Sequence, residues 1–291
     1  MIRHKDKSNM ITTTGSAATV PQSNDWNSRT AESWIAAQAA MEAMLRPFSR
    51  ALGACLGDTP ATNILDVGCG TGATTFDIQN QLGPAGQCTG IDISEAMIAA
   101  AQTRAANEGS KARFLCADAQ DYSFAGPRFD AVVSRFGVMF FGDPVAAFAN
   151  LRRACADRAP LYMLAWRAAE ENPFMTVAHD TALPLLPPEI AEQIRPTGQF
   201  AFASRNHVAG ILAQAGWSDI AIEECNAACT FPIEELGMYA ARMGPVGRLM
   251  PQLGASLQRT VIAAVQEAYA PYVDGDEVRF DAACWMISAR S

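Results

Sequence analysis

The stretch "ILDVGCGTG", residues 64–72, ends an apolar run in a glycine-rich turn, and the helix-compatible stretch "ATTFDIQNQL" follows it. A strand that leads into a helix through such a turn is typical of sites where backbone N–H groups at the start of the helix meet an anion. Gly68, Gly70 and Ala73 fit the G-x-G-x-x-G/A pattern of dinucleotide sites. The turn therefore predicts a ligand site, but its glycines leave the identity of the ligand open.

Asp66 lies two residues before the first glycine and bears on that identity. A carboxylate at this position would repel the pyrophosphate of a dinucleotide by about 3 to 4 kcal/mol at a separation of about 4 to 6 Å. S-adenosylmethionine has an ammonium and a sulfonium and no phosphate, so an acid suits it, while the start of the helix can still meet its carboxylate. Asp66 thus favours a cationic ligand without phosphate.

Two further acids follow strand-like runs. Asp92 is the last residue but one of "GQCTGIDI", at the distance from the turn where an acid binds ribose hydroxyls in either kind of site, and Asp118 ends "ARFLCAD" just before the small residue Ala119. Asp118 or the backbone beside it could meet an adenine edge. Each of these acids alone could be a turn or strand-end cap, but three in this order favour a nucleoside site.

The motifs "LDVGCGTG", "GIDIS", "ADAQD" and "FDAVVSRFGVMFF" together resemble the class I S-adenosylmethionine-dependent methyltransferase family, in particular its ubiquinone/menaquinone C-methyltransferase-like branch of small-molecule enzymes. They cover about residues 62–166, and beyond that span only the layout is similar. The contacts with the methyl donor that the resemblance implies are with its methionine part (Gly68, Gly70, Gly72), its ribose (Asp92), its adenine (Ile93, Met97, Asp118, Ala119) and its reacting end (Ser134, Phe136).

Met97 and Trp34 each have a second interpretation. Met97 lies at helical spacing and could equally be a core residue. Trp34, in the leading helical stretch, could cover the methionine end as an aromatic ring near a sulfonium, although ordinary packing explains it as well. Both stay as candidate contacts to the donor.

Strand-like and helical stretches alternate after residue 61, which predicts a doubly wound α/β fold with a parallel sheet covered on both faces. The resemblance implies a mostly parallel seven-stranded sheet of the Rossmann-like methyltransferase type. We expect a flexible tail over 1–24, helices that cover the site over 25–60, with Pro47 as a kink or boundary, and a core over 61–291. Helical insertions are expected at about 168–203 and 233–275. The runs 217–231 and 277–289 each read as one strand.

Charge and composition exclude several classes of partner. The formal net charge is −8, and after Lys5 and Lys7 the only lysine is Lys111, which disfavours nucleic acid. No apolar run approaches the roughly 20 residues of a membrane span, and no signal peptide is recognisable. The eight cysteines form no CxxC pair, so reduced thiols and no metal site are expected. A cytoplasmic protein that acts on a small molecule fits these features.

Methyl transfer from a sulfonium is a direct displacement, which requires alignment of the reactants and exclusion of water but no metal or covalent nucleophile. It would leave S-adenosylhomocysteine. A base is needed only for a protonated acceptor, and His179 is the candidate. Because "SRFG" and not "NPPY" follows the fourth strand, amide and adenine nitrogens are disfavoured, and Phe and Met nearby suggest an apolar or aromatic acceptor. O-, C-, N- and S-methylation stay open, as do an NAD(P)-dependent oxidoreductase and a non-catalytic ligand-binding protein of this fold.

Overall fold

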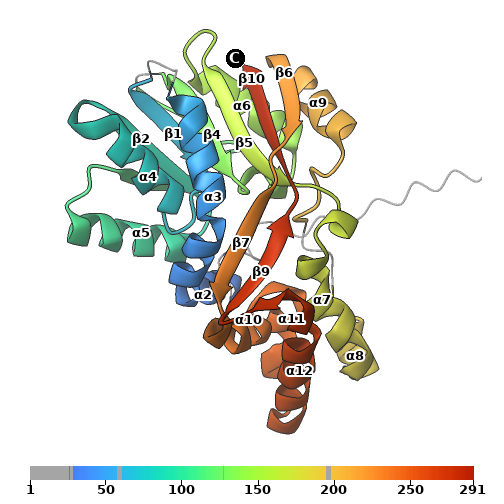
Figure 1. Ribbon diagram of the computed structural model, residues 1–291. Coiled ribbons are helices and arrows are strands. Elements are labelled where there is room, and N and C mark those ends of the chain that lie inside the picture. The colour runs from blue at the N-terminus through green and yellow to red at the C-terminus, as the bar shows by residue number, and fades with distance from the viewer. Residues whose placement is uncertain (1–25, 27–28, 58–60, 127, 195–197) are drawn as a thin grey trace, which may run out of the picture.

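A seven-stranded sheet forms the centre of the computed structural model, which describes residues 26, 29–57, 61–126, 128–194 and 198–291 (Figure 1). The strand order is β3-β2-β1-β4-β5-β10-β6, and β10 runs antiparallel to both of its neighbours while the other pairings are parallel. The predicted doubly wound sheet is confirmed. Its strands are β1 (Asn63–Val67), β2 (Gln87–Asp92), β3 (Arg113–Cys116), β4 (Ala131–Arg135), β5 (Pro160–Trp166), β6 (Ser218–Glu224) and β10 (Cys284–Arg290).

Helices cover both faces of this sheet. On one side α3 packs against α4, and on the other α6 packs against α9. The helices of this core, with the two leading ones, are α2 (Arg29–Ala36), α3 (Gln38–Leu56), α4 (Ala73–Leu82), α5 (Glu95–Glu108), α6 (Pro144–Ala154) and α9 (Arg205–Gln214). Pro47 lies inside α3, and the break between the two leading helices comes at Ala37. The expected tail at 1–24 lies outside the described residues.

Local sequence explains where several of these helices begin. Ser94, Asp143 and Ser204 are N-caps of α5, α6 and α9, and their side-chain oxygens accept hydrogen bonds from the N–H groups of the first turn. At the other end of α5, Gly109 adopts the left-handed conformation with φ of 63°. These caps fix the points at which the chain leaves each strand for the next helix, and so hold the loops at one edge of the sheet.

A second, three-stranded sheet departs from the prediction. The runs 217–231 and 277–289, each expected as one strand, are each divided between the two sheets. β6 and β10 belong to the large sheet. In the small one, β9 (Glu277–Ala282) lies between β7 (Ala227–Pro232) and the short β8 (Val273–Asp274) and pairs with both. Figure 1 shows that β7 and β9 extend from the large sheet toward the helices formed by residues 236–268. The reason is a hydrogen-bonded break at Ala283.

Asn172 holds that break. Its side chain is fully buried, accepts a hydrogen bond from the N–H of Ala283 at 2.9 Å, and donates to the carbonyl oxygens of Ala283 and Ala168 at 3.0 and 3.2 Å. The N–H of Ala283 thus pairs with a side chain, while its carbonyl oxygen also accepts from the N–H of Arg167, directly after β5, at 3.0 Å. The amide of Asn172 directs β9 away from the large sheet.

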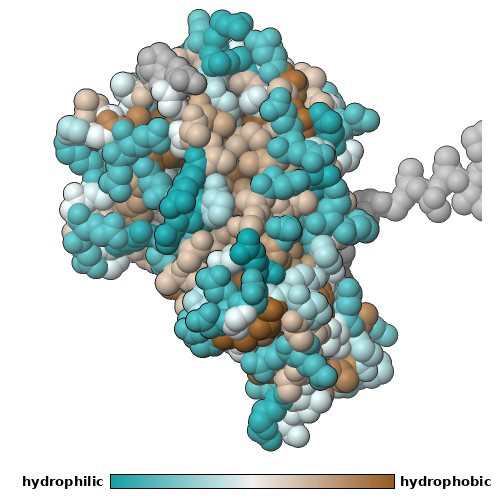
Figure 2. Space-filling model, viewed as in Figure 1, coloured by the Kyte–Doolittle hydropathy of each residue, from teal (hydrophilic) through white to brown (hydrophobic). Residues whose placement is uncertain are grey.

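The remaining helices form a lid beside the core: α7 (Pro173–Ala182), α8 (Pro188–Ala191), α10 (Leu236–Arg242), α11 (Gly244–Leu249) and α12 (Ala255–Ala268). α7 comes from the first expected insertion, and it packs against α11 and α12 from the second. On the face in Figure 2, apolar side chains gather over the middle of the molecule, with hydrophilic ones to either side. No described helix is long and apolar enough to cross a membrane.

Replacement of Asn172 by alanine should lower the free energy of unfolding by about 1 to 3 kcal/mol, because it leaves the N–H of Ala283 without its partner, while the carbonyl oxygens of Ala283 and Ala168 keep the N–H groups of Arg167 and Glu171. Asn226→Ala is the matched control, since exposed Asn226 accepts from the N–H of Cys284 at 3.3 Å on the same strand break and water can replace it. We expect the Asn226→Ala variant to lose less than about 1 kcal/mol of the free energy of unfolding. Urea denaturation measures both, and equal losses would contradict the role given to Asn172.

Candidate functional site

The loop after β1 is held by backbone contacts that require glycine. The N–H groups of Gly68 and Cys69 both donate to the carbonyl oxygen of Ile91 on β2, at 2.8 and 3.2 Å. Gly68 has φ of 67°, and a Cβ on it would lie 2.5 Å from the Cα of Gly137, in the loop after β4. The two loops therefore touch backbone to backbone. Gly137 was not singled out from the sequence, although a glycine directly after a strand end is a usable signal.

The carboxylate of Asp92 also fixes the conformation of this loop. Its two carboxylate oxygens accept hydrogen bonds from the N–H groups of Gly70, at 2.8 Å, and Ser94, at 2.9 Å. Burial raises the pKa of this carboxyl, and the backbone hydrogen bonds act in the opposite direction. With the backbone of Ile93 as a third donor, one of the four carboxylate lone pairs stays for a ligand hydroxyl. Asp92 thus fixes the glycine turn and borders the cavity at once.

Asp66, the last but one residue of β1, is fully buried under the loop. Its Oδ2 accepts a hydrogen bond from the hydroxyl of Thr75 at 2.7 Å, while its Oδ1 has no partner among the described residues. Burial raises the pKa of this carboxyl to about 7, against the lowering effects of the Thr75 hydroxyl and the Arg135 charge. An unpaired carboxylate oxygen at the floor of a cavity is costly without a ligand and fits a cationic donor group.

The cavity above these acids has a volume of about 810 Å³ and lies at the carboxyl ends of the parallel strands, where open α/β sheets bind ligands. The core and the lid both contribute to its wall. Of the predicted site residues, those in the lining are Trp34, Asp66, Gly68, Gly70, Asp92, Ile93, Met97, Asp118, Ala119 and Phe136. Ten of the predicted contacts thus border one space.

Three predicted residues do not line this cavity. Gly72 is the N-cap of α4, where a Cβ would lie 2.8 Å from the ring of Phe114. Ser134 is fully buried, donates to the carbonyl oxygen of Val67 at 2.7 Å and accepts from the N–H of Gly137. Both residues therefore support the loops from outside the cavity.

His179, the candidate base, is the third. It lies on α7 with its Nδ1 2.8 Å from a carboxylate oxygen of the neighbouring Asp180, and it is absent from the cavity wall. A base must come within hydrogen-bond reach of the proton that it removes. The structure does not bring His179 to such a position.

Aromatic side chains form the wall between core and lid. The ring of Phe136, which has φ of 63°, stacks on Trp166 with centroids 4.2 Å apart and planes within 4°. Trp166 meets Phe174 of the lid edge to face, and Phe174 stacks on Phe280 of β9. The result is a continuous series of apolar ring contacts that extends from the end of β4 into the lid.

The lining also contains residues that the sequence did not suggest: Trp26, Arg135, Gly137, Tyr239, Arg242 and Arg248. Those from the lid lie more than 70 residues from the last motif, so no local pattern connects them with the glycine turn. Their contribution depends on how the lid folds back over the core.

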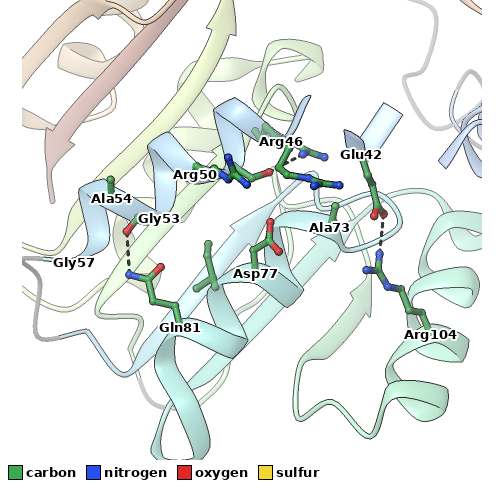
Figure 3. Close-up of a pocket in the computed structure, with 13 residues that line it drawn as sticks. Glu42, Arg46, Arg50, Gly53, Ala54, Gly57, Ala73, Asp77, Gln81 and Arg104 are labelled. Atoms are coloured by element: carbon green, nitrogen blue, oxygen red, sulfur yellow. Dashed lines mark hydrogen bonds and ion pairs between the residues drawn. The ribbon is translucent and has the colours of Figure 1, made fainter. Parts of the chain in front are cut away.

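A second cavity, of about 650 Å³, lies on the outer side of the core between α3 and α4 (Figure 3). Arg46 and Arg50 of α3 border it together with Asp77 of α4, and an ion pair of 2.7 Å between Glu42 and Arg104 closes one end. This cavity and the first one share one lining residue, Arg135.

Arg135 lines both cavities and donates a hydrogen bond to the hydroxyl of buried Ser49 on α3 at 2.7 Å. Its charge lowers the pKa of Asp66. Through this one side chain the leading helix α3 is connected to the floor of the larger cavity. Among the described residues no group of three His, Cys, Asp or Glu could hold a metal ion.

Comparison with known proteins agrees with this geometry. Residues 64–158 match the family described as "Methyltransferase domain". The chain is 35% identical over 109 residues to nocamycin O-methyltransferase of Saccharothrix syringae, covering 37% of this chain and 39% of that protein. It is 37% identical over 84 residues to demethylmenaquinone methyltransferase of Lactococcus lactis, covering 28% of this chain and 33% of that protein. The matches thus span well under half of either relative.

Among solved structures, the [4+2]-cyclase SpnF has a TM-score of 0.52 at 20% identity, covering 84% of this chain and 79% of that one. Such a likeness is one of fold, and its name shows that this fold also serves other chemistry. The family match over residues 64–158, the strand order and the glycine turn agree, and they support a methyltransferase domain of class I fold in this part of the chain.

Proposed function

We propose that this chain transfers a methyl group from S-adenosylmethionine to a small apolar or aromatic acceptor. The observation that carries the proposal is the unpaired, fully buried Oδ1 of Asp66 at the floor of the large cavity. A buried carboxylate oxygen without a donor is destabilising, and the ammonium of an amino acid would satisfy both its charge and its hydrogen-bonding capacity.

The neighbouring residues fit the rest of such a donor. The start of α4, where Thr71 and Thr74 line the cavity, suits a carboxylate, and the remaining lone pair of Asp92 suits a ribose hydroxyl. Asp118 already accepts a hydrogen bond from the N–H of Gln120 at 2.9 Å, which shapes the turn that would border the adenine. When bound, S-adenosylmethionine supplies a methyl group activated by its sulfonium.

A dinucleotide fits the same cavity less well. Asp66, Asp92 and Asp118 all border the end at which its pyrophosphate would lie. One such carboxylate alone would oppose the phosphates by about 3 to 4 kcal/mol before screening. Arg135 is the one cation on that side in the described lining, and the hydroxyl of Ser49 already accepts from it. We therefore rank the oxidoreductase below the methyltransferase.

The acceptor would lie between the aromatic wall and the lid. Phe136 and Trp166 give this part of the lining its aromatic character, and the lid helices exclude water. No histidine is among the described lining residues, and the three acids belong to the donor end. Direct displacement needs alignment above all, so the site suits an acceptor that reacts without a base from the protein.

The decisive experiment is incubation with donor labelled in its methyl group and a panel of phenols, quinols, amines and thiols, followed by mass spectrometry of the labelled product. We expect label in an aromatic acceptor. If S-adenosylhomocysteine binds and no acceptor in the panel takes up label, the chain is a ligand-binding or otherwise reactive protein of this fold.

Affinity for S-adenosylhomocysteine should fall about tenfold from pH 8 to pH 6, because Asp66 with a pKa of about 7 must lose a proton before it can pair with the ligand ammonium. Asp66→Asn should bind weakly at both values and lose this dependence, except for a residual part from Asp92, whose pKa is also raised. Calorimetric titration measures both proteins. An unchanged pH dependence in the variant would contradict the ammonium contact.

His179→Ala should leave kcat/KM within about twofold of the original value once an acceptor is known, because the ring lies outside the cavity wall and pairs with Asp180. Asp180→Ala serves as the control, since it removes the contact between His179 and Asp180 and leaves the imidazole ring in place. A loss of a hundredfold or more in His179→Ala alone, of the size expected for general base catalysis, would instead restore His179 as the base.

A further inference from the structure

Two arginines of the lid border the large cavity opposite the donor end. Arg242 is in the last turn of α10 and Arg248 in the last turn of α11, and both are among the lining residues. Arg242 is exposed and Arg248 is half-buried. They come from the same lid that closes over the aromatic wall.

Charge is divided between the two ends of this cavity. The acids in its described lining, Asp66, Asp92 and Asp118, all follow or end the strands β1, β2 and β3. No acid of the described lining comes from the lid. A ligand that filled the whole cavity would therefore meet negative charge at one end and positive charge at the other.

Neither lid arginine has a hydrogen bond or ion pair with any described residue, whereas Arg104 pairs with Glu42 and Glu108, and Arg167 pairs with Glu171 and Glu224. A cation in the last turn of a helix is favourable in itself, because it meets the negative end of the helix dipole. A side chain directed into solvent gains the same stabilisation. The helix dipole therefore does not explain why two guanidinium groups border one cavity.

The surface between the charged ends is aromatic. Phe136, Trp166 and Phe174 form one continuous set of ring contacts, and Tyr239 of α10 lines the same space. The phenol of Tyr239 hydrogen-bonds to Tyr269, whose hydroxyl donates to the carbonyl oxygen of Phe174 at 2.7 Å, so Tyr239 is held in place at this wall. A flat ring system bound here would have its far edge toward Arg242 and Arg248.

We propose that the acceptor is an aromatic molecule that carries an anionic group, a carboxylate or a phosphate, and that Arg242 and Arg248 bind this group. Guanidinium groups pair with both kinds of oxyanion through two parallel hydrogen bonds, which fixes the orientation of a ligand as well as its affinity. The proposal rests on the methyltransferase function proposed above, since it assigns the other end of the cavity to the methyl donor.

The test is calorimetric titration of the full chain, saturated with S-adenosylhomocysteine, with 2-naphthoic acid, 2-naphthyl phosphate and the neutral 2-naphthamide. We expect the acids to bind at least about tenfold more tightly than the amide, as a charge-assisted hydrogen bond predicts. The tighter of the two acids identifies the kind of oxyanion. Arg242→Gln and Arg248→Gln should each weaken the acids about tenfold and leave the amide unchanged.

Arg259→Gln is the matched control, because Arg259 is an exposed arginine of the same lid, on α12, and does not line the cavity. It should bind all three probes like the original chain, and Arg248→Lys should keep part of the preference for acids. Equal or undetectable binding of acid and amide while S-adenosylhomocysteine binds would overturn the proposal. Failure of S-adenosylhomocysteine to bind would instead overturn the proposed function.

Discussion

The buried carboxyl of Asp66 is the constraint on which the site depends. The turn above it and Thr75 beside it leave one oxygen without a partner among the described residues. Burial raises its pKa to about 7, so the folded state favours the neutral acid. The resulting stability is fully present below the unfolded pKa of about 4 and is lost as the pH rises through about 7. A bound cation offsets that loss, which couples ligand binding to the stability of the loop.

The lid depends on a different set of contacts, made where two strands leave the large sheet. Asn172 pairs with both backbone groups of Ala283, and the rings of Phe174 and Phe280 stack beside this junction. These contacts join the segment after β5 to the segment before β10, which are about a hundred residues apart. The acceptor end of the cavity therefore exists only when both segments have folded together.

The sequence was informative where the chemistry is local. The glycine turn, Asp66 and Asp92 follow from short motifs, and the alternation of strands and helices predicts the mostly parallel sheet that the structure has. The resemblance implies that Ser134 lies beside the donor, yet Ser134 is inside β4 and its hydroxyl donates to the carbonyl oxygen of Val67 below the loop. The split at Ala283 depends on Asn172, 111 residues away. Arg242 and Arg248 also reach the cavity only through the fold of the lid, which no periodicity reveals.

The central claim is that the turn and its three acids bind a cationic nucleoside without phosphate. Thermal denaturation of the purified chain at pH 8 with increasing S-adenosylhomocysteine, NAD⁺ or NADP⁺ tests it most directly, because a ligand that binds only the folded state raises the melting temperature with its concentration. The account predicts a rise with S-adenosylhomocysteine and none with the dinucleotides. A rise with NAD⁺ or NADP⁺ alone would contradict it.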